Sequence, residues 1–195
     1  MTENEQQLAH LREIRTMMER SSRFISLSGL SGVFAGFFAL AGAAAFNVYV
    51  NKNLNYGYTE LTQLANLDAM PGLISFCIID AVLVVTLSLG FAVLFTNRKA
   101  KENGQKIFDT SARRLFVSLF IPLLTGGLYC LALLYHHRFG LIAPTTLVFY
   151  GLALLNASKY TLDEIKWLGI TEITIGLVGL LFIGYGVTLW AIGFG

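Results

Sequence analysis

Long runs of apolar residues alternate with short polar segments along most of the chain. A helix needs about 20 apolar residues to cross the hydrocarbon core of a bilayer, which is roughly 30 Å thick. Runs of suitable length cover residues 24–50, 73–96, 115–135, 139–156 and 165–183, and a further run begins at 187–195. We therefore predict an all-α fold, a polytopic transmembrane helical bundle with five full spans and the start of a sixth.

Proline and glycine residues mark where the predicted helices begin, bend or break. Pro71 precedes the second run, and Pro144 lies where the first turn of the fourth helix tolerates it. Pro122, inside the third run, is a predicted kink point. The stretch Gly184 to Gly186 interrupts the last apolar run, which is too long for one crossing. The sixth span lacks the polar residues that normally close a helix, so the sequence is either truncated within it or completed against a partner.

The first 23 residues are polar and charged and lack the apolar core of a signal peptide. Leu8, Leu11, Ile14 and Met18 recur at helical spacing. This pattern predicts a short amphipathic helix on the cytoplasmic side, before the first span. We therefore divide the chain into an N-terminal helix, 1–23, and a transmembrane domain, 24–195.

The composition excludes several other classes of protein. Hydrophobic residues make up 55% of the chain and charged residues 13%, and the mean hydropathy is +0.63. A soluble domain carries about 25% charged residues. The formal net charge of +2 is too small to indicate a nucleic-acid partner, and two cysteines within apolar runs provide no disulfide framework. A soluble domain, a disordered chain and a disulfide-stapled secreted module are all excluded.

Basic residues are distributed unevenly between the segments that connect the spans. With the N-terminus in the cytoplasm, Lys52 and Arg138 are the only outer residues among the 14 lysines and arginines. Short basic segments remain on the cytoplasmic side of a membrane. We therefore predict a multi-pass protein of the bacterial inner (plasma) membrane with a cytoplasmic N-terminus.

Asp80 interrupts the second apolar run and is the first candidate for ion binding. A carboxylate within a span costs about 2.5 to 3.5 kcal/mol on insertion scales and must face protein or water. A proton or cation site is one interpretation. We favour a structural role for Asp80, with a hydrogen bond to Tyr129, Asn47 or a serine hydroxyl.

Glu172, in the fifth run, is the second ion-binding candidate. It forms a predicted polar region with Asn156, Lys159, Asp163 and Glu164 at the inner end of the fourth and fifth spans. Capping and local salt bridges explain this region with fewer assumptions than an ion vestibule.

Cysteine and histidine residues near the outer side form a candidate metal site. Cys77 lies one helical turn before Asp80, and Cys130, His136 and His137 lie in or just after the third run. These residue types bind transition metals. The sequence contains neither a Cys-x-x-Cys nor a His-x-x-x-His spacing, so interface histidines and buried thiols are the simpler explanation. We predict no cofactor.

Small residues recur at four-residue spacing in the first span, at Ser28, Gly32 and Gly36. Such stripes let helices approach closely where lipid gives no hydrophobic drive for association. We expect this stripe to pack the span within its own bundle, and pairing of two protomers is the alternative.

Three segments carry a resemblance to known sequences: 19–32 (ERSSRFISLSGLSG), 112–115 (ARRL) and 141–164. They resemble an uncharacterised family of small multi-spanning bacterial inner-membrane proteins. Members of that family complete the sixth helix and continue into a short basic tail. The resemblance implies the same fold and compartment, and it implies no activity, cofactor or site residues.

The chain contains no hydrolase, metalloprotease or nucleotide-binding motif, so we lean against an enzyme. Our leading hypothesis is a non-enzymatic protein that acts in the bilayer through lipids, a second copy of itself or a partner membrane protein. The alternative is a small transporter or proton-coupled channel that uses Asp80. The third hypothesis is a membrane redox or metal-binding protein.

Overall fold

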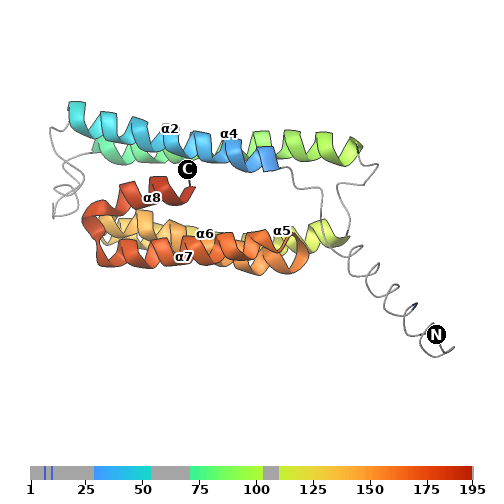
Figure 1. Cartoon of the computed structure of the whole chain (residues 1–195). Coiled ribbons are helices and arrows are strands. Elements are labelled where there is room, and N and C mark those ends of the chain that lie inside the picture. The colour runs from blue at the N-terminus through green and yellow to red at the C-terminus, as the bar shows by residue number, and fades with distance from the viewer. Residues whose placement is uncertain (1–6, 8–9, 11–28, 54–70, 103–109, 195) are drawn as a thin grey trace.

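The computed structural model describes residues 7, 10, 29–53, 71–102 and 110–194 (Figure 1). All regular structure in these ranges is helical, which confirms the predicted all-α class. The elements are α2 (Gly29–Asn53), α4 (Pro71–Glu102), α5 (Thr110–Tyr135), η2 (Phe139–Leu141), α6 (Ile142–Ala157), η3 (Ser158–Tyr160), α7 (Glu164–Leu181), η4 (Ile183–Tyr185) and α8 (Gly186–Phe194). The predicted amphipathic helix over 1–23 lies outside the described residues, apart from Gln7 and His10.

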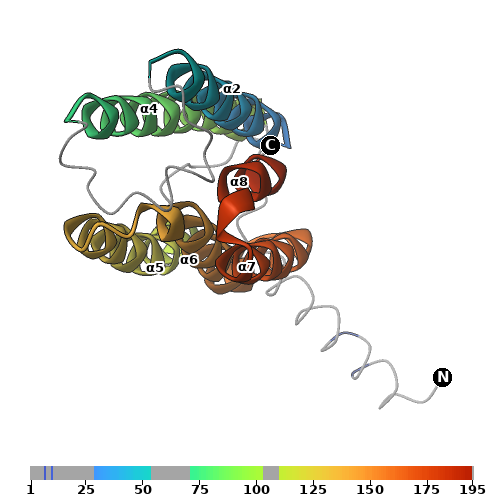
Figure 2. The same cartoon turned by 90° about the vertical axis from the view of Figure 1, so that its left-hand side faces the viewer.

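The helices form two layers that are connected by α8. α2 and α4 lie side by side as an antiparallel hairpin, and α5, α6 and α7 form the second layer (Figure 1). α6 contacts both α5 and α7 and is therefore the middle helix of its layer. α8 packs on α6 and α7 and also contacts α2, so it closes one side between the layers (Figure 2). Below, α2 with α4 is the hairpin, and α5 to α8 are the bundle.

Four helical segments of the described chain are long and apolar enough to cross a membrane: Gly32–Lys52, Gly72–Arg98, Ala112–Tyr135 and Phe139–Tyr160. They correspond to the first four predicted spans. α7 carries Glu164, Lys166 and Glu172 within its 18 residues and is not among them. The last apolar helix, Ile183–Phe194, is shorter. The protein thus has the helices of a membrane-spanning bundle, and its fifth and sixth spans stay predictions.

The boundaries of the elements differ from the predicted ones by a few residues. α4 continues past the predicted end of the second span to Glu102, and α5 runs through Pro122 as a single helix. Pro144 lies in the first turn of α6, as expected, because a proline there removes no helical hydrogen bond. The predicted break at Gly184 begins earlier, at Phe182, whose φ of −116° and ψ of 63° end α7.

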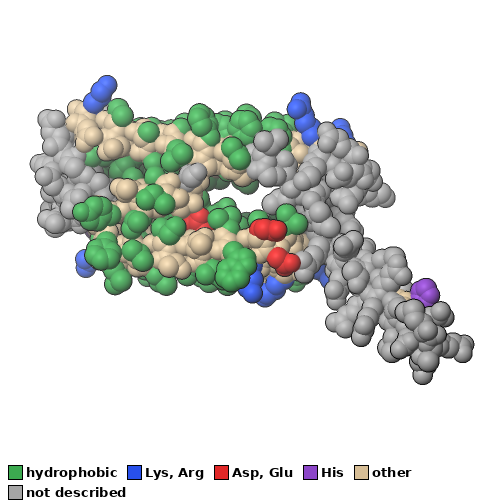
Figure 3. Space-filling model, in the orientation of Figure 1, with side chains coloured by type: hydrophobic (Ala, Val, Ile, Leu, Met, Phe, Trp, Pro, Cys, Tyr) green, Lys and Arg blue, Asp and Glu red, His purple; other side chains and the backbone are tan. Residues whose placement is uncertain are grey.

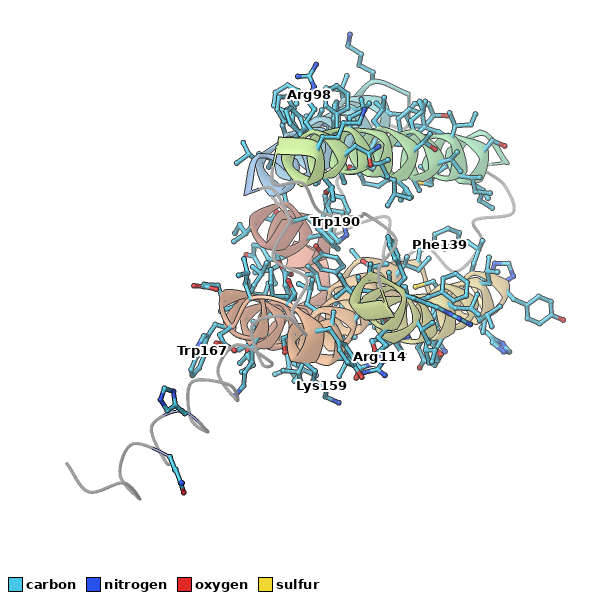
Figure 4. All side chains as sticks on the ribbon, turned by 90° about the vertical axis from the view of Figure 1, so that its right-hand side faces the viewer. Arg98, Arg114, Phe139, Lys159, Trp167 and Trp190 are labelled. Carbon is cyan, nitrogen blue, oxygen red and sulfur yellow. The ribbon has the colours of Figure 1, made fainter. Side chains whose placement is uncertain are left out.

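An aromatic contact joins the hairpin to the bundle at the end where α2 finishes. Val50 of α2 and Leu73 of α4 form a buried cluster, and Phe139 of η2 packs against it. Figure 4 shows Phe139 and Trp190 in the space between the two layers. The hairpin is therefore held at two places, by η2 and by α8.

Glycine residues bring α6 and α7 into backbone contact. A Cβ atom at Gly169 would lie 2.8 Å from the carbonyl oxygen of Gly151, and one at Gly176 would lie 2.9 Å from the carbonyl oxygen of Pro144. Only glycine fits such an approach, because it has no Cβ. The buried residues of α7 are Gly169, Glu172, Gly176 and Gly179, and they form the stripe that faces α6.

The predicted small-residue stripe of the first span is displaced in the structure. Ser28 lies outside the described residues, and a Cβ at Gly32 would have open space around it. Gly36 is buried, and the buried face continues through Ala39 and Gly42. Strict four-residue spacing rotates by about 40° per step around a helix with 3.6 residues per turn. Alternating steps of three and four residues stay on one face, so the contact follows them.

Basic side chains gather at the two ends of the molecule (Figure 3). α4 ends and α5 begins at one end, where α6 also connects to α7 (Figure 1). The exposed basic residues on these helix ends are Arg98, Lys101, Arg113, Arg114, Lys159 and Lys166. Lys52 and Arg138 lie at the opposite end, next to η2 and the end of α2. The predicted orientation depends on the unequal numbers of basic residues at these two ends. The orientation itself stays a prediction.

Candidate functional site

Glu172 is fully buried at the centre of the bundle, with 2% of its surface exposed. It lies on the glycine stripe of α7, between Gly169 and Gly176. Its Oε2 atom makes no hydrogen bond within the described residues. A Cβ at Gly193 would lie 2.7 Å from Oε2 and 2.6 Å from Cδ2 of Leu147. The backbone of α8 therefore covers this carboxylate oxygen directly.

A hydrogen bond and tilted aromatic ring contacts hold α8 over this position. The Trp190 Nε1–H donates to Oγ1 of Thr146 at 3.0 Å. The ring of Phe194 lies 4.8 Å from those of both Trp190 and Tyr150, measured between centroids. Tyr150 of α6 lies within electrostatic range of Glu172. α6 thus supplies the hydroxyl groups on this side, and α8 supplies the cover.

The structure separates Glu172 from the polar residues with which the sequence had grouped it. Asn156 donates from Nδ2 to the carbonyl oxygen of Ser118 at 2.9 Å and accepts from Nζ of Lys159 at 3.2 Å. These contacts tie the end of α6 to α5. Glu172 faces Gly193 instead, so the predicted capping and local salt bridges do not explain why it is there.

Asp80 lies on the side of α4 that faces α2. A Cβ at Gly42 would lie 3.2 Å from Oδ2 of Asp80 and 2.6 Å from Cγ2 of Val84. The side chain is only partly buried. Asp80 therefore resembles Glu172 in lying against a glycine, and differs from it in exposure.

Two of the partners predicted for Asp80, Asn47 and Tyr129, make other contacts in the structure. Oδ1 of Asn47 accepts from Nδ2 of Asn51 at 3.4 Å, within α2. The ring of Tyr129 packs against Phe149 at 5.9 Å, between α5 and α6. Tyr129 belongs to the bundle and Asp80 to the hairpin, which explains why this pair does not meet.

The candidate metal ligands lie on two elements and do not converge. Cys77 packs against the buried cluster that joins α2 to α4, and Cys130 is half-buried on α5. His136 is exposed and lies edge-on to the ring of Tyr135, whereas His137 lines the cavity described next. The described part of the chain holds no group of three or more His, Cys, Asp or Glu residues that could hold a metal ion.

A cavity of about 450 Å³ lies between α4 and α5. It is lined by Ile74 of α4 and by Leu131, Leu134, Tyr135 and His137 from the end of α5. The volume lies within the range of small-molecule sites, about 300 to 1,000 Å³.

A residue in the left-handed conformation ends α5 beside this cavity. His137 has a φ of 56°, its N–H donates to the carbonyl oxygen of Leu134 at 3.0 Å, and the N–H of Arg138 donates to that of Leu133 at 2.8 Å. This is the Schellman arrangement, in which glycine usually holds the left-handed position. Histidine in its place puts an imidazole at the cavity, directly before the exposed Arg138.

Sequence reasoning missed the stripe that contains Glu172, although the signal was present. Gly169, Glu172, Gly176 and Gly179 recur at steps of three and four residues, which is the spacing of one helix face. The cavity had no comparable signal, because leucines that line it and leucines that face lipid look alike in a sequence.

Comparison with protein-family models, with curated proteins and with solved structures finds no match for this chain. The resemblance carried by residues 19–32, 112–115 and 141–164 therefore stays a prediction.

Proposed function

We propose that this protein is a non-enzymatic, membrane-spanning bundle that binds an anionic phospholipid in the cavity between α4 and α5. The observation that carries the proposal is the cavity itself, about 450 Å³ in volume, with an apolar wall and with His137 in its lining, the residue directly before Arg138. This proposal specifies the partner as a lipid, which is one of the partners expected from the sequence.

The lining of the cavity suits a hydrocarbon chain. Ile74, Leu131 and Leu134 offer aliphatic surface from two facing helices. α8 closes the opposite side of the molecule, so the space between α4 and α5 opens away from it (Figure 2). When these helices cross a bilayer, that opening faces the lipid, and an acyl chain enters sideways without passing through water.

The end of α5 suits a phosphate group. Arg138 follows the cavity residue His137 and is exposed, and a guanidinium binds phosphate through paired N–H donors. Tyr135 is 80% exposed at the same end. Aromatic and basic residues are typical of the level of lipid headgroups. Together they favour a negatively charged headgroup over a zwitterionic one.

The proposed location is the inner membrane of a bacterium, with the more basic end of the molecule in the cytoplasm. Alkaline phosphatase and a fluorescent reporter, each fused after Lys52 and after Lys101, test this orientation. We expect phosphatase activity only after Lys52 and fluorescence only after Lys101. The opposite pattern would reverse the orientation.

Native mass spectrometry tests the lipid proposal. The protein is released from nanodiscs that contain equal amounts of phosphatidylglycerol and phosphatidylcholine. We expect a retained adduct of phosphatidylglycerol, loss of the adduct in Leu131→Trp, where the indole fills the cavity, and loss of headgroup selectivity in Arg138→Gln.

Leu128→Trp is the matched control, because Leu128 is exposed on α5 and does not line the cavity. This variant should keep the selective adduct. Equal retention of both lipids by the unmodified chain, or identical behaviour of the Leu131→Trp and Leu128→Trp variants, would reduce the observation to ordinary surface lipid.

A further inference from the structure

The buried carboxyl group of Glu172 has no role in the lipid-binding proposal and needs its own explanation. It lies on the packing stripe of α7, it is 2% exposed, and Oε2 has no hydrogen-bond partner within the described residues. A buried ionised group without a partner is strongly unfavourable, and buried polar atoms are normally hydrogen-bonded. An acidic residue at such a position indicates a bound species that neutralises it.

Among the residues that the structure describes, the helices packed around Glu172 provide no counter-cation. α6 and α8 contain no lysine, arginine or histidine, and the ionisable group that α6 presents to Glu172 is Tyr150. α8 presents Gly193 with the aromatic residues Trp190 and Phe194. On α7 itself, the charged residues Glu164 and Lys166 are exposed near the start of the helix.

The space around Oε2 decides which species fits. The α8 backbone at Gly193 and the side chain of Leu147 lie directly against the carboxyl group. Oγ1 of Thr146 already donates to the carbonyl oxygen of Ala143 at 2.7 Å and accepts from Trp190. A metal cation such as Ca²⁺ needs about six to eight oxygen ligands and the room for them, whereas a proton needs no cavity.

We propose that Glu172 is a proton-binding site and that its occupancy controls how α8 packs on α6 and α7. With the proton bound, the neutral carboxyl group fits under Gly193 as the structure shows. When the proton leaves, the carboxylate requires water or a cation, and either can reach Oε2 only if α8 moves away from α7. Proton binding and α8 packing are therefore linked reciprocally.

Infrared spectroscopy of the full chain in lipid nanodiscs tests for the proton directly. We expect a carboxylic-acid C=O band that titrates with pH, that disappears in Glu172→Gln and that persists in Asp80→Asn, the matched variant in the hairpin. A band that persists in Glu172→Gln and disappears in Asp80→Asn would overturn the assignment, as would a band that both variants retain. Should Glu172→Gln fail to fold, Gly193→Ala keeps the carboxyl group and must shift the band, and an unshifted band overturns the proposal.

Tryptophan fluorescence tests the link to α8. The sequence contains two tryptophans, and Trp167→Phe leaves Trp190 of α8 as the single emitter. We expect the emission maximum of Trp190 to shift over the pH range in which the infrared band titrates, and we expect the shift to be lost in Glu172→Gln. An emission maximum that does not depend on pH, or one that depends on pH equally in both proteins, contradicts the link.

Discussion

The hairpin and the bundle bring their helices together with opposite kinds of side chain. In the hairpin, the ring of Phe34 stacks on those of Phe91 and Phe95 with centroids 5.1 Å away in each case. In the bundle, α6 and α7 touch through the backbones of Gly151 and Gly169. Burying apolar surface gives no advantage within lipid, so helices gain from van der Waals contact instead. Large rings and missing side chains are two ways to obtain it.

The hairpin and the bundle also differ in how deeply each buries its acidic residue. Asp80 and Glu172 both lie against a glycine of the neighbouring helix, Gly42 and Gly193 respectively. Asp80 is partly buried, whereas the backbone of α8 lies directly against the carboxyl group of Glu172. The cover that α8 provides, and not the residue type, therefore separates the partly buried carboxyl group from the enclosed one.

Adding one methyl group to the α6–α7 interface should have the largest effect on stability. A Cβ at Gly169 meets two backbone atoms, the carbonyl oxygen of Gly151 at 2.8 Å and the amide nitrogen of Leu155 at 2.9 Å, and backbone cannot rotate away. We expect Gly169→Ala to lower the free energy of unfolding by about 1 to 3 kcal/mol. Reversible unfolding in mixed SDS micelles measures the change.

Gly90→Ala is the control in the hairpin, because a Cβ there has open space around it. Alanine favours a helix over glycine by about 1 kcal/mol, so this variant should be neutral or more stable. Equal losses for the Gly169→Ala and Gly90→Ala variants would show that the α6–α7 backbone contact does not carry the stability of the bundle.

Replacing the acidic residue of each region should distinguish the bundle from the hairpin by a gain in stability and not by a loss. Glu172→Met keeps the length of the side chain and removes the unpaired oxygen, so we expect a gain of about 1 to 2 kcal/mol in the free energy of unfolding. Asp80→Asn should change it little, because its carboxylate is only partly buried. The same unfolding assay compares both, and a loss of stability in Glu172→Met would mean that Glu172 makes a stabilising contact.

The sequence predicted the helices of both regions but not how they pack against one another, and the reason is physical. The apolar runs and the position of Pro144 predicted the helices, because length and backbone chemistry act locally. The packing faces were harder to predict, because the apolar residues around the glycine stripe of α7 fit a neighbouring helix or lipid equally well. The small-residue stripe of the first span illustrates the difficulty, since the observed contact follows Gly36 and leaves Gly32 in open space.

The candidate sites were predicted to a smaller extent. Asp80 and Glu172 were recognised as acidic residues in apolar runs, which a sequence shows directly. Their surroundings depend on α8 and on the separation of the hairpin from the bundle, and both arise from contacts between residues distant in the chain. For the same reason the sequence does not show how the candidate metal ligands lie relative to one another: Cys77 packs against the buried cluster of the hairpin, and His137 lines the cavity.

A substitution in the aromatic stack tests how much the ring contacts of the hairpin contribute to the stability of the protein. Phe91 contacts the ring of Phe34 at 5.1 Å and that of Phe38 at 5.2 Å. Aromatic pairs contribute about 0.5 to 1.5 kcal/mol beyond the area they bury, so Phe91→Leu should destabilise the protein by an amount in that range. Phe120→Leu, at an exposed position on α5, should leave unfolding unchanged. Similar losses in both variants would mean that the loss of a phenyl ring from the lipid surface accounts for the effect.

The smallest expected effect concerns the bond that fastens α8 to α6, from Trp190 Nε1 to Oγ1 of Thr146 at 3.0 Å. Hydrogen bonds between membrane helices contribute about 0.6 kcal/mol on average, because an unfolded helix in lipid also finds partners. A double-mutant cycle of Trp190→Phe and Thr146→Val should give a coupling energy of this size. Thr146→Val, which keeps Trp190 as the reporter, should also widen the pH-dependent shift of α8, since a weaker attachment lets the helix leave Glu172 more readily. A coupling energy of zero would assign the position of α8 to the close approach at Gly193 and to the contacts of the Trp190, Phe194 and Tyr150 rings alone. The bundle would then resemble the hairpin in being held by shape and not by polar contacts.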